Sequence, residues 1–265
     1  MYIREVVEFL ESFAPVTWQE SYDNAGLIVG DHNMTCTGIL VCLDSTEDII
    51  QEAINTKCNL VIAHHPILFS GLKKINGHHY VEKAIIKAIR NDIAIFAIHT
   101  NLDNAYYQGV NAKIAEKLRL VNTRILQPKT FFGKEGEAIG AGMIGQLPEQ
   151  FTIEAFFSHV KSAMAISNFR HTRIIKNNIV HVAICGGSGS FLIKKAIEAG
   201  ADVFITADIK YHEFFEANDQ ILVLDIGHYE SEKFTIDLLY TILQNKFSTF
   251  AVRFTKHITN PVYYH

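Results

Sequence analysis

Two distant stretches of this chain align with one another without gaps. Residues 39–65 match residues 182–208, so that His65 meets Asp208. In each copy a short apolar run leads through a loop into a helical pattern and then into a second apolar run, which is typical of a β-α-β unit. Two ordinary units can match this well by chance. The next apolar run and a His-x-x-x-acid group also recur after both copies, which favours a duplicated half.

The duplication predicts an α/β protein of two similar, interlocked α/β lobes. We expect the N-terminal lobe to cover residues 1–124 and the C-terminal lobe residues 125–265. The second lobe includes a middle segment, 125–178, in which glycines predict turns and a strand and 153–165 predicts a helix. The glycines of the middle segment are Gly133, Gly136, Gly140, Gly142 and Gly145.

Imidazole and carboxylate side chains gather just past three short apolar runs. His64 and His65 follow the run 60–63, His99 and Asp103 follow 93–98, and His228 and Glu232 follow 221–224. Because the ends of buried strands carry the chemistry of α/β folds, we expect these groups to meet in one site at the junction of the lobes. A surface hydrogen bond, or a pair that caps the sheet, would explain any one group alone, but the three together favour a metal site.

The spacing within each group suits ligation. In each His-x-x-x-acid pair the separation of four residues places both side chains on one face of a helix. His64 and His65 would point to opposite faces of a regular strand, so joint ligation requires irregular backbone. Pro66 favours this, because it holds the preceding residue extended and ends the hydrogen-bonded ladder.

The donor types indicate the kind of metal. Neutral imidazoles and carboxylates without thiolates suit a borderline divalent ion such as Zn, Fe, Mn, Co or Ni, and a mixed shell of this kind is typical of catalytic sites. We predict two divalent metal ions per subunit, with Glu232 as the best candidate to bridge them. Such a pair would lower the pKa of water towards about 7 and stabilise developing oxyanions.

Further residues are candidates for proton transfer or substrate binding. His99, Asp208 and His212 are the candidates for moving protons, although an ordinary loop would also explain the last two. A glycine- and serine-rich loop between a predicted strand and a predicted helix could hold phosphate with its backbone N–H groups. Its residues are Gly187, Ser188, Gly189 and Ser190. The loop is neither a P-loop nor a dinucleotide fingerprint, and a plain tight turn explains it equally well.

The composition excludes several classes of partner. Hydrophobic residues make up 48% and charged residues 20% of the chain, which indicates an ordered globular protein. A net charge of −4 without any run of Lys or Arg argues against a large nucleic-acid-binding surface. No signal-peptide pattern and no membrane-spanning apolar run is found, and the four cysteines form no CxxC pair. We expect a cytoplasmic protein that acts on a small molecule.

Six motifs, in order and over essentially the whole chain, resemble the NIF-three-like family, whose bacterial members are called GTP cyclohydrolase 1 type 2 homologues. They are residues 18–27 (WQESYDNAGL), 63–66 (AHHP), 99–103 (HTNLD), 183–190 (AICGGSGS), 201–212 (ADVFITADIKYH) and 227–232 (GHYESE). Ala207 stands where the family usually has glycine and Tyr22 where tryptophan is common, but neither is a ligand position. The short middle segment resembles the compact form without an inserted domain.

The resemblance implies a two-lobed NIF-three-like fold, a dinuclear metal centre and a toroidal homohexamer. By motif, the ligands would be His64, His65, Asp103, His228 and Glu232, with His99 close by. The name of the bacterial members implies hydrolytic opening of the purine ring of GTP, in which water attacks C8 and a second hydrolysis releases formate. A phosphoester or another nucleotide would suit the same site. The alternative is a non-catalytic metal-binding or regulatory scaffold that engages protein partners, because the family is named for an interaction.

Overall fold

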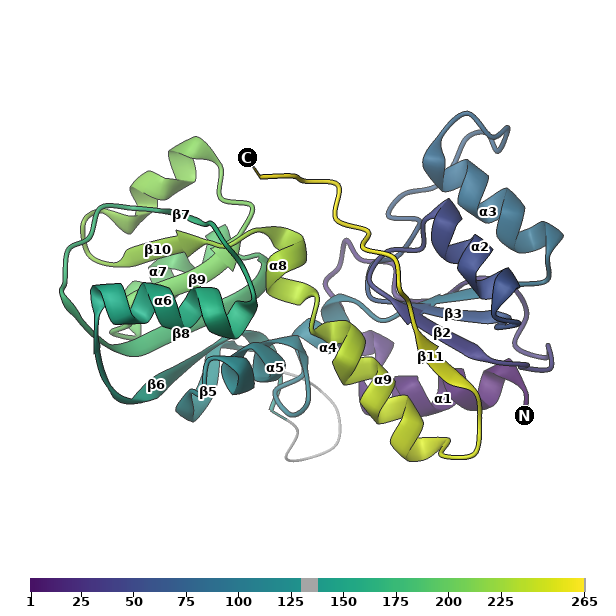
Figure 1. Ribbon diagram of the computed structural model, residues 1–265, viewed down its shortest axis with the longest axis horizontal. Coiled ribbons are helices and arrows are strands. Elements are labelled where there is room, and N and C mark those ends of the chain that lie inside the picture. The colour runs from purple at the N-terminus through teal and green to yellow at the C-terminus, as the bar shows by residue number, and fades with distance from the viewer. Residues whose placement is uncertain (130–137, 265) are drawn as a thin grey trace. The chain divides into compact units, whose positions relative to one another are not determined.

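The computed structural model describes residues 1–129 and 138–264 and confirms an α/β fold with two sheets. The chain divides into two compact units, which Figure 1 shows as ribbons. The first unit comprises Met1–Leu102 and Thr235–Tyr263, and the second comprises Asp103–Phe234 with the last residues of the chain. This division differs from the expected boundary at residue 124. Strand β11 (Val252–Phe254) pairs with β2 (Ile39–Cys42), which returns the C-terminal segment to the first unit.

The first unit is built on a five-stranded sheet. Its order is β1 (Gly26–Val29), β4 (Ala94–Ala97), β3 (Leu60–Ala63), β2 and β11. Strand β1 runs antiparallel to β4, and the other four strands are parallel. Every residue of β2, β3 and β4 is buried, as expected for parallel strands that are covered on both faces.

Helices cover both faces of this sheet (Figure 1). Helices α2 (Glu47–Asn55) and α3 (Tyr80–Arg90) lie on one face and bury Ile49, Ile50, Ala84 and Ile85 against it. Helices α1 (Ile3–Phe13) and α9 (Thr235–Lys246) lie on the other. Helix α1 buries only the residues of one helical stripe, Ile3, Val6, Val7 and Leu10, each of which stabilises the fold by about 1.5–3 kcal/mol.

The second unit is built on a six-stranded mixed sheet. Its order is β5 (Val121–Pro128), β6 (Gly140–Thr152), β8 (Asn178–Ser188), β9 (Val203–Ala207), β10 (Leu222–Asp225) and β7 (Arg170–His171). Strands β8, β9 and β10 are parallel to one another, and the remaining pairings are antiparallel.

The helices of the second unit are short, apart from α6 (Ile153–Met164). Thr152 caps α6 by accepting a hydrogen bond from the backbone N–H of Ala155. Helix α7 (Ile193–Glu198) packs on the sheet face that carries Ala183, Phe204 and Val223. The remaining elements are α5 (Val110–Lys117), η2 (Ser190–Leu192), η3 (Tyr211–Ala217) and α8 (His228–Glu232), while α4 (Thr100–Asp103) spans the boundary between the units.

The two units contain the repeated pattern in the same register. Strand β2 pairs with β3 so that Ile39 faces Leu60, and β8 pairs with β9 so that Val182 faces Val203. These four residues are also the ones that the sequence alignment matches in pairs. Each unit therefore has three adjacent parallel strands whose carboxyl ends lie at one edge of its sheet.

The middle segment was predicted correctly where it is described. Strand β6 and helix α6 confirm the expected strand and helix, whereas the turns expected at Gly133 and Gly136 lie outside the described residues. All four cysteines are buried and none is in a disulfide. Within residues 1–129 and 138–264, no helix combines the length and the apolar character needed to cross a bilayer.

Candidate metal centre

Three imidazoles lie together at the carboxyl edge of the first sheet. The backbone bends after β3, and the backbone N–H of His65 donates to the carbonyl oxygen of Leu43, just past β2, at 2.9 Å. This places His64 and His65 beside the end of β4, which His99 follows. The ring centroids are 4.9 Å apart for His64 and His65, 5.3 Å for His64 and His99, and 5.4 Å for His65 and His99. One ring nitrogen from each imidazole lies within 4.8 Å of the other two, close enough for one metal ion.

The irregular backbone that joint ligation requires is present. Strand β3 ends at Ala63, so His64 and His65 both lie beyond the regular part of the strand. Their rings therefore gather in one place, with an interplanar angle of 49°, instead of pointing to opposite faces of the sheet. His64 is fully buried, and the side chain of His65 is 13% exposed.

Each of these imidazoles uses Nδ1 to donate a hydrogen bond. The acceptors are the carbonyl oxygen of Ile98 for His64 at 2.9 Å, Oδ1 of Asp44 for His65 at 2.8 Å, and Oδ1 of Asp23 for His99 at 2.8 Å. A carbonyl or ionised carboxylate oxygen can only accept, so the proton of the neutral ring is assigned to Nδ1. Hydrogen-bonded Nδ1 atoms of this kind are the usual support of histidines that bind a metal through Nε2.

Topology explains why Asp23 and Asp44 stand beside these rings. Asp44 follows β2, the strand next to β3, and Asp23 precedes β1, which runs antiparallel to β4. Burial raises the pKa of the Asp23 carboxyl, but hydrogen bonds from His99 and Thr100 outweigh it and lower that pKa to about 2. Burial also raises the pKa of the Asp44 carboxyl, but hydrogen bonds from His65 and Thr259 outweigh it, so that this pKa is lowered as well. Both carboxyls are therefore ionised at neutral pH.

A second cluster lies at the carboxyl edge of the sheet in the second unit. Strand β10 leads through Gly227 into α8, whose first turn carries His228 and Glu232 on one face, as the spacing predicts. Nε2 of His228 lies 3.0 Å from Oε2 of Glu232, and Nδ1 lies 2.7 Å from Oδ2 of Asp208 at the end of β9. Asp208 has a positive φ of 56°, a conformation that a non-glycine residue adopts at some energetic cost and often at a functional site.

The second cluster contains a nearly buried carboxylate, that of Glu232. Glu232 is only 2% exposed. Burial lowers the pKa of His228, but the carboxylates of Glu232 and Asp208 raise it more strongly, to about 11. A cation between these two carboxylates is therefore strongly favoured, and in the metal-free chain the protonated imidazole supplies it.

The glycine- and serine-rich segment was expected to be a loop, but its first two residues, Gly187 and Ser188, are the last residues of β8, and Gly187 packs against this cluster. Gly187 has a φ of +60°, and a Cβ atom there would overlap Oε1 of Glu232 and lie 3.3 Å from Cε1 of His228. The backbone N–H of Gly187 donates to Oγ of Ser231 at 2.9 Å. Ser190 forms a side-chain hydrogen bond with Glu213. The segment thus makes room for Glu232, and phosphate binding by Gly187, Ser188, Gly189 and Ser190 stays a prediction.

Asp103 lies beside the second cluster, because one of its carboxylate oxygens is within 4.8 Å of one of Glu232, whereas His212 has different surroundings. Asp103 is the last residue of α4, and its carbonyl oxygen accepts a hydrogen bond from Asn111. His212 lies exposed on η3, where its ring contacts Tyr211 and Phe215. These ring contacts place His212 in a surface aromatic group, whereas Asp208 contacts His228 directly.

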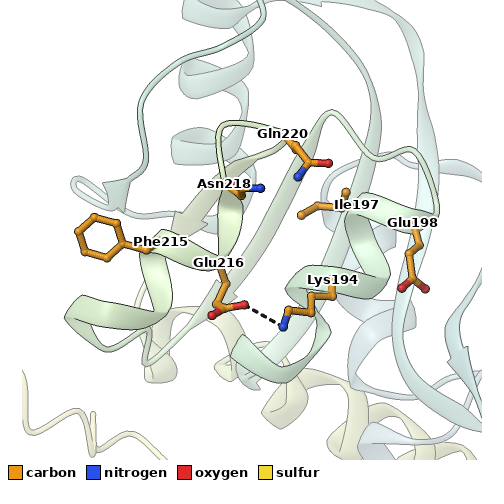
Figure 2. A pocket seen from close by; sticks show the side chains of 7 residues that line it. All are labelled: Lys194, Ile197, Glu198, Phe215, Glu216, Asn218 and Gln220. Carbon is orange, nitrogen blue, oxygen red and sulfur yellow. Dashed lines mark ion pairs between the residues drawn. The ribbon is translucent and has the colours of Figure 1, made fainter.

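A cavity of about 400 Å³ lies elsewhere in the second unit (Figure 2). Its lining comes from α7, η3 and the following turn: Lys194, Ile197, Glu198, Phe215, Glu216, Asn218 and Gln220. Lys194 pairs with Glu216 at 3.1 Å across its mouth, and both side chains are well exposed. None of the residues predicted to bind metal or move protons lines this cavity, so it is separate from both clusters.

The donor set of both clusters fits a divalent metal. Imidazoles with hydrogen-bonded Nδ1 atoms and the carboxylates of Asp103 and Glu232 are donor types that suit Zn, Fe, Mn, Co and Ni, and thiolates are not among them. The fold and the clusters together define a two-unit α/β protein with histidine and glutamate groups that could bind a metal ion.

The comparisons with known proteins identify the family. The family model Duf34/NIF3 (NGG1p interacting factor 3) matches residues 1–261, and the chain belongs to this family. A GTP cyclohydrolase 1 type 2 homolog of Clostridium acetobutylicum is 34% identical over 231 residues, which cover 87% of this chain and 85% of that protein. The Bacillus cereus protein related to NIF3 superposes with a TM-score of 0.92 at 25% identity, covering 100% of this chain and 99% of that one.

A further relative confirms the compact form. The alignment with a GTP cyclohydrolase 1 type 2 homolog of Staphylococcus epidermidis runs over 329 positions at 29% identity, although it covers 86% of this 265-residue chain and 89% of the relative. An alignment longer than the chain itself means that the relative carries additional residues. This chain lacks those residues.

Proposed function

We propose that this protein is a hydrolase that depends on a dinuclear metal centre and acts on a nucleotide-like substrate. In this proposal the ligands are His64, His65, Asp103, His228 and Glu232. The observation that carries the proposal is the common arrangement of the imidazoles. Each has its Nδ1 bound to a carbonyl or carboxylate oxygen, which is the usual support of histidines that bind a metal through Nε2.

Bound divalent ions would supply Lewis acidity and lower the pKa of water towards about 7. The chain's own residues would orient and move protons. Asp23 holds Nδ1 of His99, so Nε2 of His99 can accept a proton from water as it attacks. The ionised Asp23 then stabilises the imidazolium, in the manner of a carboxylate that orients a catalytic histidine. His99 is thus the proposed proton acceptor, and Asp208 orients His228.

The substrate class comes from the names of the relatives. Several are called GTP cyclohydrolase 1 type 2 homolog, which motivates GTP as the first substrate to test. In that reaction water adds at C8 of the purine, the C8–N9 bond breaks, and a second water releases formate. Other nucleotides and phosphoesters belong in the same test. We retain a toroidal homohexamer and a cytoplasmic location as parts of the proposal, and light scattering after size-exclusion chromatography would measure the assembly.

The test is a turnover screen on protein loaded in turn with Zn²⁺, Mn²⁺ and Co²⁺. Formate, phosphate and nucleotide products would be measured for GTP, other nucleotides and simple phosphoesters. We expect metal-dependent turnover that falls by about 100-fold or more in His99→Gln, the size of a general-base contribution, while metal content is unchanged. Turnover that is insensitive to His99→Gln would contradict the proposed role of this residue.

A non-catalytic scaffold is the second candidate. It is favoured by the description of the family, which names an interacting factor. A scaffold would bind metal and retain its assembly but show no metal-dependent turnover on the whole panel. That outcome would replace the hydrolase proposal, whereas turnover of any substrate that is lost together with metal would exclude a purely structural role.

A further inference from the structure

The C-terminal tail passes the carboxyl edge of the first sheet. Strand β11 is parallel to β2, and the backbone N–H of Thr255 donates to the carbonyl oxygen of Val41 at 2.9 Å. Two parallel neighbours leave a sheet at the same edge. The residues after β2 therefore lead to Asp44 and those after β11 lead to Thr259, although the two positions are far apart in sequence.

Thr259 contacts the carboxylate that holds His65. Its Oγ1 donates to Oδ2 of Asp44 at 2.5 Å, while Oδ1 of Asp44 accepts the hydrogen bond from Nδ1 of His65 at 2.8 Å. The side chain of Asp44 is 37% exposed, so packing alone does not define the plane of its carboxylate. Binding both oxygens does define it, and this directs Oδ1 at the imidazole.

The same arrangement occurs a second time in this unit. Asp23 binds Nδ1 of His99 through Oδ1, and its Oδ2 accepts a hydrogen bond from Oγ1 of Thr100 at 2.5 Å. Both aspartates thus carry an imidazole on one oxygen and a threonine hydroxyl on the other. Thr100 is the neighbour of His99 in the chain, whereas Thr259 reaches Asp44 from the opposite end of the sequence.

A separate anchor places the tail. The buried Glu52 accepts a hydrogen bond from Oγ1 of Thr255 at 2.5 Å and another from the backbone N–H of Lys256 at 3.0 Å. The backbone beside Thr259 is therefore positioned without help from Asp44. The hydroxyl of Thr259 adds an interaction that is directed at the carboxylate.

We propose that Thr259 is a positioning residue for the metal ligand His65, acting through Asp44 to hold the imidazole with its proton on Nδ1 and its lone pair on Nε2. The ligand role of His65 rests on the proposed function, but its orientation by Thr259 is a property of the metal-free chain. The tail then influences metal affinity without providing a ligand.

Three variants test this. Thr259→Val removes the hydroxyl and keeps the shape, and Thr259→Ser keeps the hydroxyl. Thr255→Val is the matched control, because it removes an equally short hydrogen bond from the same tail to the carboxylate of Glu52. The backbone N–H groups of Thr255 and Lys256 keep their bonds to Val41 and Glu52 in this variant, and these bonds keep the tail in place. Zn²⁺ affinity would be measured by competition with a chromophoric chelator. Long-range ¹H–¹⁵N spectra of the imidazoles in metal-free protein at about pH 8 would report the tautomer of His65. His65→Gln would assign its signals among the 13 histidines.

We expect Thr259→Val to weaken Zn²⁺ binding on the order of 10-fold, as for other outer-shell partners, and to shift the His65 ring from one tautomer to a mixture. Thr259→Ser and Thr255→Val should both behave as the wild type in these two measurements. Equal affinities and spectra for Thr259→Val and Thr255→Val would overturn the inference. If the wild type bound no Zn²⁺, the proposed function would fail, and the His65 spectrum would still decide the role of Thr259.

Discussion

Gly187 lies directly against the carboxylate of Glu232. The glycine has a φ of +60°, and any Cβ atom at this position would overlap Oε1 of Glu232. The contact joins the end of β8 to helix α8, which carries both His228 and Glu232. The glycine therefore determines how closely the acid can approach the strand end.

Gly187→Ala is expected to displace Glu232 and to weaken Zn²⁺ binding by about 10-fold, in addition to about 1–2 kcal/mol of backbone strain. Gly200→Ala is the matched control, because Gly200 has a φ of +77° and no atom within 4 Å of an added Cβ. Gly200→Ala should lose stability through backbone strain but keep the Zn²⁺ affinity of the wild type. Denaturant unfolding measures the stability and chelator competition measures the affinity. Equal Zn²⁺ affinity of the two variants would show that the contact with Glu232 has no influence on the ligand.

Replacing Asp23 by Ala should lower the free energy of unfolding by about 1–3 kcal/mol. The change leaves the backbone N–H of Thr100 and the Nδ1 proton of His99 without their acceptor. Asp31→Ala is the control, since Asp31 accepts its hydrogen bond from Asn33 in an exposed turn. Its effect should stay within about 0.5 kcal/mol. Urea unfolding of both variants measures these free energies. Similar losses of stability in Asp23→Ala and Asp31→Ala would argue against the special role of Asp23.

Asp202 should make the stability of the second unit fall at acidic pH. Burial raises the pKa of this carboxyl, but Lys176 and the backbone N–H groups of His181 and Val180 lower it below its ordinary value of 3.8. Because the folded-state pKa is the lower one, the stabilisation is present above 3.8 and is lost as the pH falls through the folded value. Asp202→Asn should therefore lose less stability than the wild type between about pH 6 and about pH 3.

The comparison for this measurement is Asp219→Asn. Asp219 pairs with Arg173 at 3.5 Å, with both side chains largely exposed, so its removal should leave the acid dependence unchanged. Urea midpoints at the two pH values provide the data. An acid dependence that is the same in Asp202→Asn and in the wild type would contradict the assignment.

The parallel strands and the residues at their ends could be predicted from the sequence, because short apolar runs reveal buried strands. His64 and His65 directly follow one such run, and His228 lies a short distance past another. The same rule could have found Asp44, two residues past β2. The role of Gly187 could not be predicted, since periodicity does not tell which side chain packs on a glycine.

Long-range pairing explains what else the sequence did not reveal. Nothing in the local pattern of residues 252–254 indicates that this strand joins β2. This pairing places the C-terminal segment in the first unit and brings Thr259 to Asp44. Sequence spacing reports contacts within one element, such as His228 with Glu232. Contacts between elements distant in the chain require the pairing of strands to be known.

The metal content of the purified protein tests the central claim most directly. Wild-type protein prepared without chelators would be analysed by inductively coupled plasma mass spectrometry. The variants His65→Ala and Glu232→Ala, and the control His78→Ala at an exposed position, would be analysed in the same way. The account predicts about two divalent ions per chain in the wild type and the control, and fewer than one in the other two variants while they remain folded. Stoichiometric metal retained by both His65→Ala and Glu232→Ala, or none in the wild type after incubation with Zn²⁺ or Mn²⁺, would contradict it.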